Sequence, residues 1–219
     1  MENLLEVIDL GKKSYSEAYN IQMDVLDKKI SDDEHHTLIL VEHPPVFTIG
    51  RSGSESNIII NKNLLKEKGI EVHNIDRGGD ITYHGPGQIV GYPILKLDYL
   101  KKDLHWLLRN YEEIFIRLLK DEFNINAERV TGLTGVWVDD SKITAIGIGV
   151  KKWITFHGFA FNVNTNLEHF NYIIPCGISN KGITSLEKLK DEKIDFEKTK
   201  AQVANYFAEV FNMELLSDG

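Results

Sequence analysis

Two side chains that lie far apart in this sequence could together carry out nucleophilic chemistry, Cys176 and Lys142. Cys176 lies in IIPCGISNKG, where a preceding proline and a following glycine favour an irregular, accessible loop. A free thiol has a pKa of about 8.5, so a nearby cation or base is needed to enlarge its thiolate fraction at neutral pH. Lys142 opens the apolar segment KITAIGIGV, where burial would lower its pKa and let it alternate between neutral base and cation.

Both residues also have an ordinary structural interpretation. A lone cysteine is more often a small buried apolar side chain, and a lysine in a turn is more often a solvated surface group. The two positions are 34 residues apart (176 − 142 = 34), so spacing alone does not establish that they meet. At this level both interpretations stay open.

A third candidate is the segment RGGDITYHGPGQIVGYP at residues 77–93. Its glycines allow sharp bends and bring backbone N–H groups close to a ligand. Arg77 can bind a carbonyl or phosphate group, and Tyr83 and His84 can donate or accept a proton. A glycine-rich hairpin with Arg77 in an ordinary ion pair explains the same residues equally well.

Composition narrows the class of protein. The 219 residues are 42% hydrophobic, enough for one sizeable core, and no apolar run is long enough to span a membrane. The formal net charge of −8 argues against general nucleic-acid binding, which needs a basic surface. A single cysteine and an N-terminus without a secretion signal indicate a reducing cytoplasm. The eight histidines lack metal-ligand spacing, so we expect no metal and no cofactor.

Periodicity and capping signals predict the elements that must position these residues. Ser14 and Glu17 have capping-box spacing and begin a helix reaching about Lys29. Residues 101–123 form a long amphipathic helix, Thr184 and Glu187 begin a short one, and Asp195 begins the last. Short apolar or alternating runs predict strands at 4–9, 37–42, 46–49, 88–97, 134–139, 142–150 and 153–163, with turns at 138–142 and at Lys151–Lys152.

Interspersed strands and helices with hairpins predict an α/β (α+β) fold, in which a mixed, partly antiparallel sheet carries helices. No repeat or linker divides the chain, so we expect one domain over residues 1–219.

Taken together and in order, the motifs resemble the lipoyl(octanoyl) transferase family, the octanoyl-[acyl-carrier-protein]:protein N-octanoyltransferases. The resemblance covers most of the chain. The segments that carry it are EHPPVFTIGR at 42–51, RGGDITYHGPGQIVGYPI at 77–94, GVWV with KITAIGIGV, FHGFAFNV and IPCGI.

The resemblance implies a role for each matching position and the fold of the biotin and lipoate protein ligase catalytic domains. Cys176 corresponds to the nucleophile that carries the acyl chain as a thioester, and Lys142 to the lysine that lowers its pKa or takes its proton. Three segments correspond to the family's substrate-binding residues: Arg77, Gly78, Gly79, Asp80, Ile81, Thr82, Tyr83 and His84; Ala145, Ile146 and Gly147; Gly158, Phe159 and Ala160.

The implied reaction transfers an octanoyl group from octanoyl-acyl carrier protein to a lysine of lipoyl-domain proteins, in lipoate cofactor biosynthesis. The implied acceptors are dehydrogenase E2 subunits and the glycine cleavage H protein, with no nucleic-acid or membrane partner. We expect a basic patch that includes Arg51, Lys151 and Lys152 to dock the acidic partners. The alternatives are an ATP-dependent lipoate-protein ligase, a non-catalytic module that binds acyl chains or acyl carrier protein, and a cysteine-dependent hydrolase.

Overall fold

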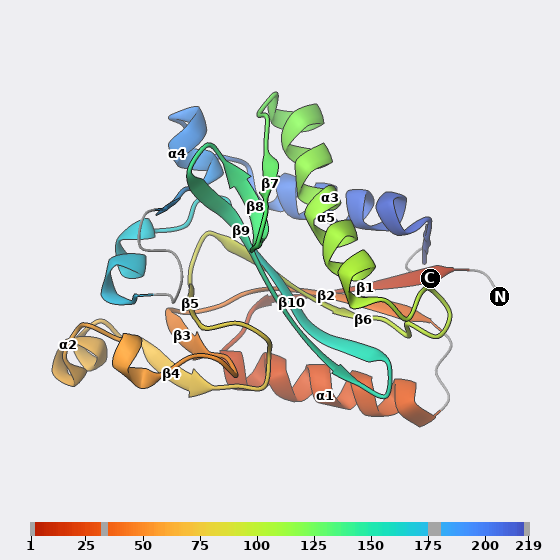
Figure 1. Ribbon diagram of the computed structural model, residues 1–219, viewed down its shortest axis with the longest axis horizontal. Helices are drawn as coiled ribbons and strands as arrows, with labels where there is room; N and C mark the ends of the chain where they lie inside the picture. Colours follow the sequence, from red (N-terminus) through yellow and green to blue (C-terminus); the bar gives the residue numbers. More distant parts are fainter. Residues whose placement is uncertain (1–2, 32–34, 175–180, 217–219) are drawn as a thin grey trace.

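A long mixed sheet runs through the molecule and carries helices on both faces (Figure 1). The structure is a computed structural model that describes residues 3–31, 35–174 and 181–216. In this part of the chain the strands follow the order β12-β1-β2-β6-β10-β9-β8-β7, with β11 beside β9. Their bounds are β1 Leu4–Lys12, β2 His36–Glu42, β6 Gln88–Ile94, β7 Glu128–Val130, β8 Leu133–Val138, β9 Ser141–Lys151, β10 Ile154–Asn162, β11 Gly182–Ile183 and β12 Glu214–Leu215.

Strand directions make this sheet mixed. The run from β2 through β6, β10, β9 and β8 to β7 is antiparallel, whereas β1 pairs in parallel with both β2 and β12. The expected α/β class with a mixed, partly antiparallel sheet is therefore confirmed.

A second, smaller sheet lies beside one end of the large one (Figure 1). It consists of β4 (Glu71–Asn74), β3 (Val46–Ile49) and β5 (Ile81–His84) in that order. The helix α2 (Lys62–Glu67) and the short 3₁₀ segments Glu55–Asn57 and Leu167–Tyr172 belong to the same region. The side chains of Phe47, Ile81 and Tyr83 form its buried centre together with Ile173.

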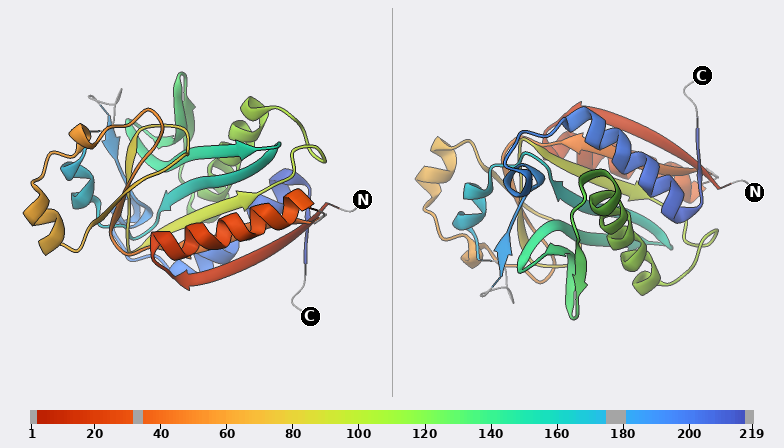
Figure 2. Two further views of the ribbon diagram at one scale, coloured as in Figure 1. Left: turned by 90° about the horizontal axis from the view of Figure 1, so that it is seen from below. Right: turned by 90° about the horizontal axis from the view of Figure 1, so that it is seen from above.

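The long helices cover opposite faces of the large sheet (Figure 2). On one face lies α1 (Tyr15–Ser31), and on the other lie α3 (Leu104–Phe123) and α5 (Phe196–Phe211), with the short α4 (Leu186–Lys190) between β11 and α5 in the chain. The capping box at α1 forms as expected: the backbone N–H of Ser14 donates to Glu17 Oε2 (3.1 Å), and that of Glu17 donates to Ser14 Oγ (3.3 Å). In the described part of the chain, none of the helices is both long and apolar enough to cross a membrane.

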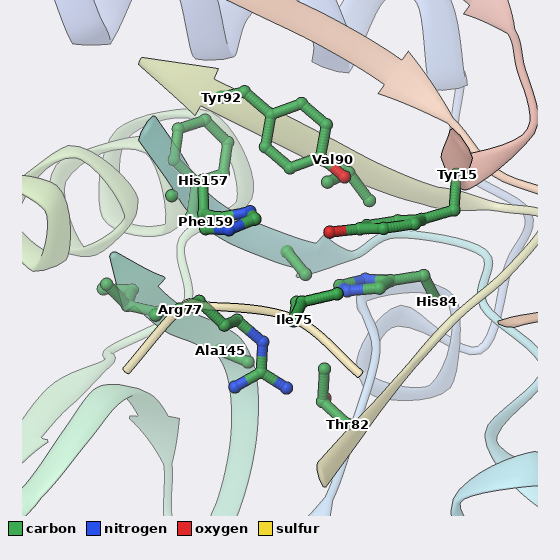
Figure 3. A pocket seen from close by; sticks show the side chains of 14 residues that line it. Tyr15, Ile75, Arg77, Thr82, His84, Val90, Tyr92, Ala145, His157 and Phe159 are labelled. Atoms are coloured by element: carbon green, nitrogen blue, oxygen red, sulfur yellow. The ribbon is translucent and has the colours of Figure 1, made fainter. Parts of the chain in front are cut away.

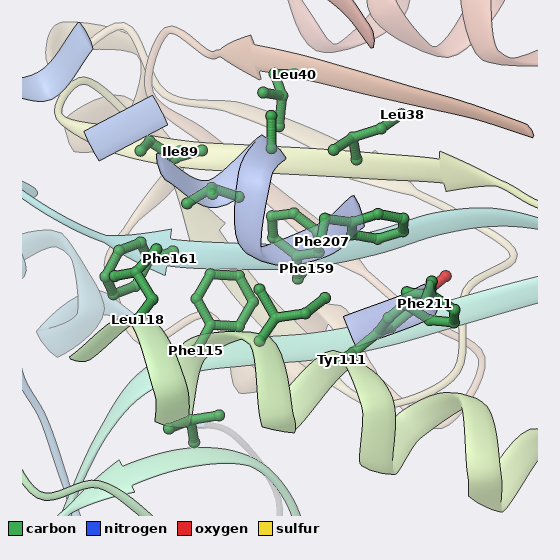
Figure 4. Close-up of a cluster of buried hydrophobic side chains, with 14 of the residues drawn as sticks. Leu38, Leu40, Ile89, Tyr111, Phe115, Leu118, Phe159, Phe161, Phe207 and Phe211 are labelled. Carbon is green, nitrogen blue, oxygen red and sulfur yellow. The ribbon is translucent and has the colours of Figure 1, made fainter. Parts of the chain in front are cut away.

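Aromatic side chains join α3 and α5 to the sheet (Figure 4). The ring of Phe115 on α3 lies 4.9 Å from that of Phe159 and 5.0 Å from that of Phe161, both on β10. Burying each such side chain contributes about 1.5–3 kcal/mol, so this contact fixes the position of β10 and of the neighbouring β9.

Most predicted elements are confirmed, and several boundaries were wrong. The hairpin between β9 and β10 turns at Lys152–Trp153, where both residues have positive φ (51° and 60°), and not at Lys151–Lys152. The short helix is capped by Ser185, whose Oγ accepts from the N–H of Lys188 (3.2 Å), and not by Thr184. The sequence analysis missed α2, β4, β7 and the short β11 and β12, and it assigned β5 to a loop, because these elements are too short to show a period.

Gly135 shapes the edge of the sheet beside Lys142. Its φ is +127°, and a Cβ atom there would lie 2.6 Å from the backbone oxygen of Thr144 and 3.2 Å from Cε of Lys142. The pairing of β8 with β9 shifts register next to this glycine, and its N–H donates to the buried carboxylate of Glu112 (3.2 Å). Only glycine satisfies this backbone geometry without strain.

We expect Gly135→Ala to destabilise the protein by roughly 3 kcal/mol or more, since it combines backbone strain with a steric clash. Gly132→Ala is the matched control: Gly132 also has positive φ (+81°), but nothing lies within 4 Å of its added Cβ. Urea unfolding measures both, and equal losses of stability in the two variants would contradict the steric account.

Candidate active site

The three predicted binding segments come together although they are distant in the chain. In the antiparallel pairing of β9 with β10, Ala145 lies opposite Ala160, Ile146 opposite Phe159 and Gly147 opposite Gly158. The segment from Arg77 to His84 crosses this pair, and the N–H of Gly78 donates to the carbonyl oxygen of Ile148 (2.8 Å). That bond occupies Gly78 N–H, so this group is not free to stabilise an oxyanion.

Two adjoining cavities lie between these segments. The first, called here the outer cavity, has a volume of about 350 Å³ and is lined by Lys142 among others. The second, the inner chamber, is about 60 Å³ and is shown in Figure 3. Five residues border both and mark where the two meet: Arg77, Thr82, Ala145, Ile146 and Ala160.

Most of the other residues that we predicted to bind substrate line one of the two cavities. Gly79, Asp80 and Ile81 line the outer cavity, and His84, Gly147 and Gly158 line the inner chamber. The ring of Phe159 belongs to the core beneath α3, so it borders the chamber through its backbone.

Lys142 is a partly buried cation in the outer cavity. Its Nζ lies 4.8 Å from the centre of the buried Trp137 ring, a cation–π contact. Among residues 3–31, 35–174 and 181–216, no carboxylate lies within ion-pair distance of it. Burial lowers the pKa of Lys142 from 10.5 to about 8, which places it in the range where it can both hold and release a proton.

Cys176 lies outside the described residues, but residues 182–184 are fixed against the start of β9. Ile183 on β11 pairs with Lys142, and the N–H of Thr184 donates to the Lys142 carbonyl oxygen (3.0 Å). Lys181 forms an ion pair with Asp140 (2.5 Å) at the turn before β9. The fold therefore brings a segment seven residues beyond the cysteine in the chain to Lys142, a proximity that sequence spacing could not establish.

Arg77 is buried at the junction of the two cavities, 8% exposed. Its guanidinium donates to the backbone oxygen and to Oγ1 of Thr48 (2.8 and 3.2 Å), while its Nε has no hydrogen-bond partner. No carboxylate in the described part of the chain forms an ion pair with it, so the competing interpretation of an ordinary ion pair is wrong there. Burial lowers the pKa of Arg77 to about 10, and it remains a cation at neutral pH.

Tyr83 and His84 are neighbours in sequence but face different surroundings. The hydroxyl of Tyr83 pairs with Nδ1 of His169 (2.8 Å) in the small-sheet region, and burial raises its pKa to about 12. His84 lines the inner chamber, with Nδ1 2.8 Å from Gln88 Oε1. Burial lowers the pKa of His84 to about 3, so its imidazole is neutral at physiological pH.

The sequence analysis missed three ring-bearing residues of the inner chamber: Tyr15, Tyr92 and His157. His157 is the most unusual, because it has φ +54° in the middle of β10 and its Nε2 lies 2.9 Å from Asp76 Oδ1. A polar residue inside the apolar run ITFHGFAF was an available signal for His157. Tyr15 follows a helix cap, and nothing in its local sequence distinguishes it.

The docking patch of Arg51, Lys151 and Lys152 stays a prediction, but Lys151 lies far from Lys142 along the strand. Lys151 is the last residue of β9 and Lys142 is the second, so about 30 Å of strand separates these two lysines. Lys151 instead lies 3.4 Å from Asp27 of α1. Within the described residues, no group of three or more His, Cys, Asp or Glu side chains is arranged to hold a metal ion.

Comparisons with known proteins identify relatives over nearly the whole chain. The model of the lipoyl protein ligase A/B catalytic domain matches residues 14–208. An octanoyltransferase of Caldicellulosiruptor saccharolyticus is 53% identical over 94% of this chain and 88% of its own length. An octanoyltransferase of Alkaliphilus metalliredigens is 46% identical over 97% of both chains.

Solved structures share the fold at low sequence identity. A putative lipoate protein ligase from T. acidophilum with bound lipoic acid has a TM-score of 0.74 at 14% identity, covering 100% of this chain and 89% of that one. The biotin protein ligase from Aquifex aeolicus has a TM-score of 0.52 at 13% identity, covering 97% and 70%. The predicted likeness to the biotin and lipoate protein ligase fold is confirmed.

The depressed pKa of Lys142 predicts a specific dependence of stability on pH. Folded Lys142 releases its proton near pH 8, whereas the unfolded chain does so near 10.5. The burial penalty is therefore complete below pH 8 and disappears as pH rises to 10.5. We expect Lys142→Met to be more stable than the native protein at pH 7, by at most about 3 kcal/mol, with the advantage vanishing near pH 10.5.

Urea unfolding at pH 7 and at pH 10 measures this difference. Lys198→Met, at an exposed position on α5, is the matched control and should show no such trend. A stability difference for Lys142→Met that stays constant between the two pH values would refute the burial penalty.

Proposed function

The chain belongs to the lipoyl protein ligase A/B catalytic-domain family and is an octanoyltransferase. On this basis we propose that it transfers an octanoyl group from octanoyl-acyl carrier protein to a lysine of lipoyl-domain proteins. The octanoyl group is carried in between as a thioester on Cys176. In this proposal residues 1–219 act as one catalytic domain in the cytoplasm, in lipoate biosynthesis. Dehydrogenase E2 subunits and the glycine cleavage H protein are the proposed acceptors.

The proposal depends on the charge, the pKa and the position of Lys142. It is a cation without a described carboxylate partner, its pKa is lowered to about 8, and it lines a cavity large enough for an acyl chain. A thiolate near such an ammonium is stabilised by direct charge attraction, which lowers the thiol pKa. The pairing of β11 with β9 supports placing the nearby Cys176 in its range.

The proposed reaction proceeds in two steps. In the first step, Cys176 gives its proton to Lys142 and its sulfur attacks the thioester carbonyl. The new C–S bond forms as the carrier's C–S bond breaks, and the departing thiolate takes up the proton from Lys142. In the second, the acceptor amine attacks the acyl-enzyme, an amide forms, Cys176 leaves as thiolate, and Lys142 accepts the proton that the amine loses. The lowered pKa of Lys142 suits both directions of proton transfer.

The cavities provide the binding energy for the acyl chain. Apolar side chains of Ile81, Leu133 and Ile146 line the outer cavity together with the methyl groups of Ala145 and Ala160. Each buried CH₂ group contributes about 0.8 kcal/mol, so an octanoyl chain gains several kcal/mol there. Since a thioester is already activated, this route needs no ATP, which distinguishes it from the ligase alternative.

Intact mass spectrometry after mixing the protein with octanoyl-acyl carrier protein, without ATP or Mg²⁺, tests the covalent step. We expect one added octanoyl group that hydroxylamine removes, and none in Cys176→Ser. We expect Lys142→Ala to acylate about 10²–10⁴-fold more slowly, the usual loss when a proton-transfer group is removed.

The same samples distinguish the alternatives. Free octanoate released without an acceptor would indicate a hydrolase, and transfer that requires ATP would indicate a ligase. A stable complex with the carrier protein but no mass change on the enzyme, and no amide on an added lipoyl domain, would refute octanoyl transfer.

A further inference from the structure

Tyr15 and Ile75 each border two hollows in the molecule. Both line the inner chamber, and both also line an open groove of about 600 Å³ on the surface beside α1. Figure 3 shows Tyr15 reaching from its helix into the chamber, with Ile75 also among the residues that line it. These two side chains form the partition between the chamber and the surface groove. The other residues of the groove are Ser16, Tyr19, Asn20, His73, Asn74 and Asp76.

Lys142 lines the outer cavity, and the partition lies on the other side of the inner chamber from that cavity. Ala145, where the cavities meet, is three residues along β9 from Lys142, a distance of about 10 Å. Three backbone bonds of an extended chain span about 3.4 Å, so the seven C–C bonds of an octanoyl group span roughly 8 Å. An octanoyl chain that starts beside Lys142 and follows β9 therefore ends near the entrance of the inner chamber.

The inner chamber has room for only a short extension of such a chain. Its volume of about 60 Å³ accommodates roughly four to six water-sized groups. A longer acyl chain would fill the chamber and then meet Tyr15 and Ile75.

The partition is held firmly in place. Tyr15 is buried (4% exposed) and is the first residue of α1, between Ser14 and Glu17 of the capping box. Its ring lies 5.1 Å from that of His73 and 5.8 Å from that of His43. The backbone N–H of Ile75 donates to the carbonyl oxygen of Ile49 (2.9 Å), which fixes its segment to the small sheet. The Tyr15 ring therefore cannot move aside without disrupting packing, and the backbone at Ile75 is fixed.

The polar atoms of the chamber also make it chemically unsuited to more alkyl chain. The hydroxyl of Tyr15 at the partition and Nε of Arg77 at the entrance are buried, and neither has a hydrogen-bond partner among the described residues. Water in the chamber can satisfy these groups, whereas alkyl carbons that displace the water cannot.

We propose that Tyr15 and Ile75 set the upper limit of acyl chain length by separating the inner chamber from the surface groove. The inference rests on the proposed octanoyl transfer and assigns its chain-length selection to two residues outside the catalytic pair. Removing either side chain joins the chamber to the groove, so that saturated acyl chains of about sixteen carbons, too long for the chamber alone, can extend into it.

A panel of octanoyl, dodecanoyl, tetradecanoyl and hexadecanoyl thioesters of acyl carrier protein tests the proposal, with single-turnover acylation followed by mass spectrometry. Burying one additional CH₂ group changes the relative rate constant for acylation about fourfold. We expect Tyr15→Ala and Ile75→Ala to raise the hexadecanoyl-to-octanoyl ratio of rate constants about tenfold or more. Tyr15→Phe keeps the ring, and Asn20→Ala alters only the exposed groove, so both should retain the native ratio.

Unchanged ratios in folded Tyr15→Ala and Ile75→Ala would overturn the proposal. If Tyr15→Ala fails to fold, Tyr15→Leu and Ile75→Ala provide the same comparison. Absence of acylation of the native protein by every thioester would refute octanoyl transfer instead. In that case, thermal shifts with free fatty acids of eight to sixteen carbons still decide the point: hexadecanoate must stabilise Ile75→Ala more than the native protein, and equal shifts would overturn the partition.

Discussion

The candidate site depends on one close backbone contact between the two sheets. The N–H of Gly78 donates to the carbonyl oxygen of Ile148 (2.8 Å), and a Cβ on Gly147 would lie 2.8 Å from the Gly78 oxygen. A side chain at position 147 would push the segment from Arg77 to His84 away from β9. Glycine at this crossing therefore lets two strands of the large sheet and a segment of the small sheet enclose common cavities.

Two buried cations share this enclosed space, which gives the cavities their electrostatic character. Arg77 lies at their junction and Lys142 lines the outer cavity, and neither forms an ion pair with a carboxylate in the described ranges. A cation held without a partner in a low-dielectric site favours negative charge that develops nearby. Thiolate formation and charge on a thioester carbonyl oxygen are such charges, so this electrostatic arrangement suits acyl transfer.

Hydrogen bonds connect the inner chamber to the strand that carries Lys142. His84 pairs with Gln88 (2.8 Å), and the Gln88 amide donates to Asn162 Oδ1 (2.9 Å). Asn162 in turn donates to the carbonyl oxygen of Thr184 (3.0 Å), whose N–H donates to Lys142. Because satisfied polar networks are rigid, this chain fixes the small sheet, β10 and β11 in one arrangement around the cavities.

The sequence by itself determined the elements that depend on local signals, including the capping box at Ser14, the apolar period of α3 and the strand that begins near Lys142. The order of its motifs also indicated the family. Only the tertiary structure decided that β11 pairs with β9 at Lys142, that Arg77 is buried without an ion pair, and that Tyr15 borders the inner chamber. Capping and periodicity act between residues a few positions apart and leave a pattern in the chain. Burial and cavity walls arise from residues many positions apart, and no local pattern records them.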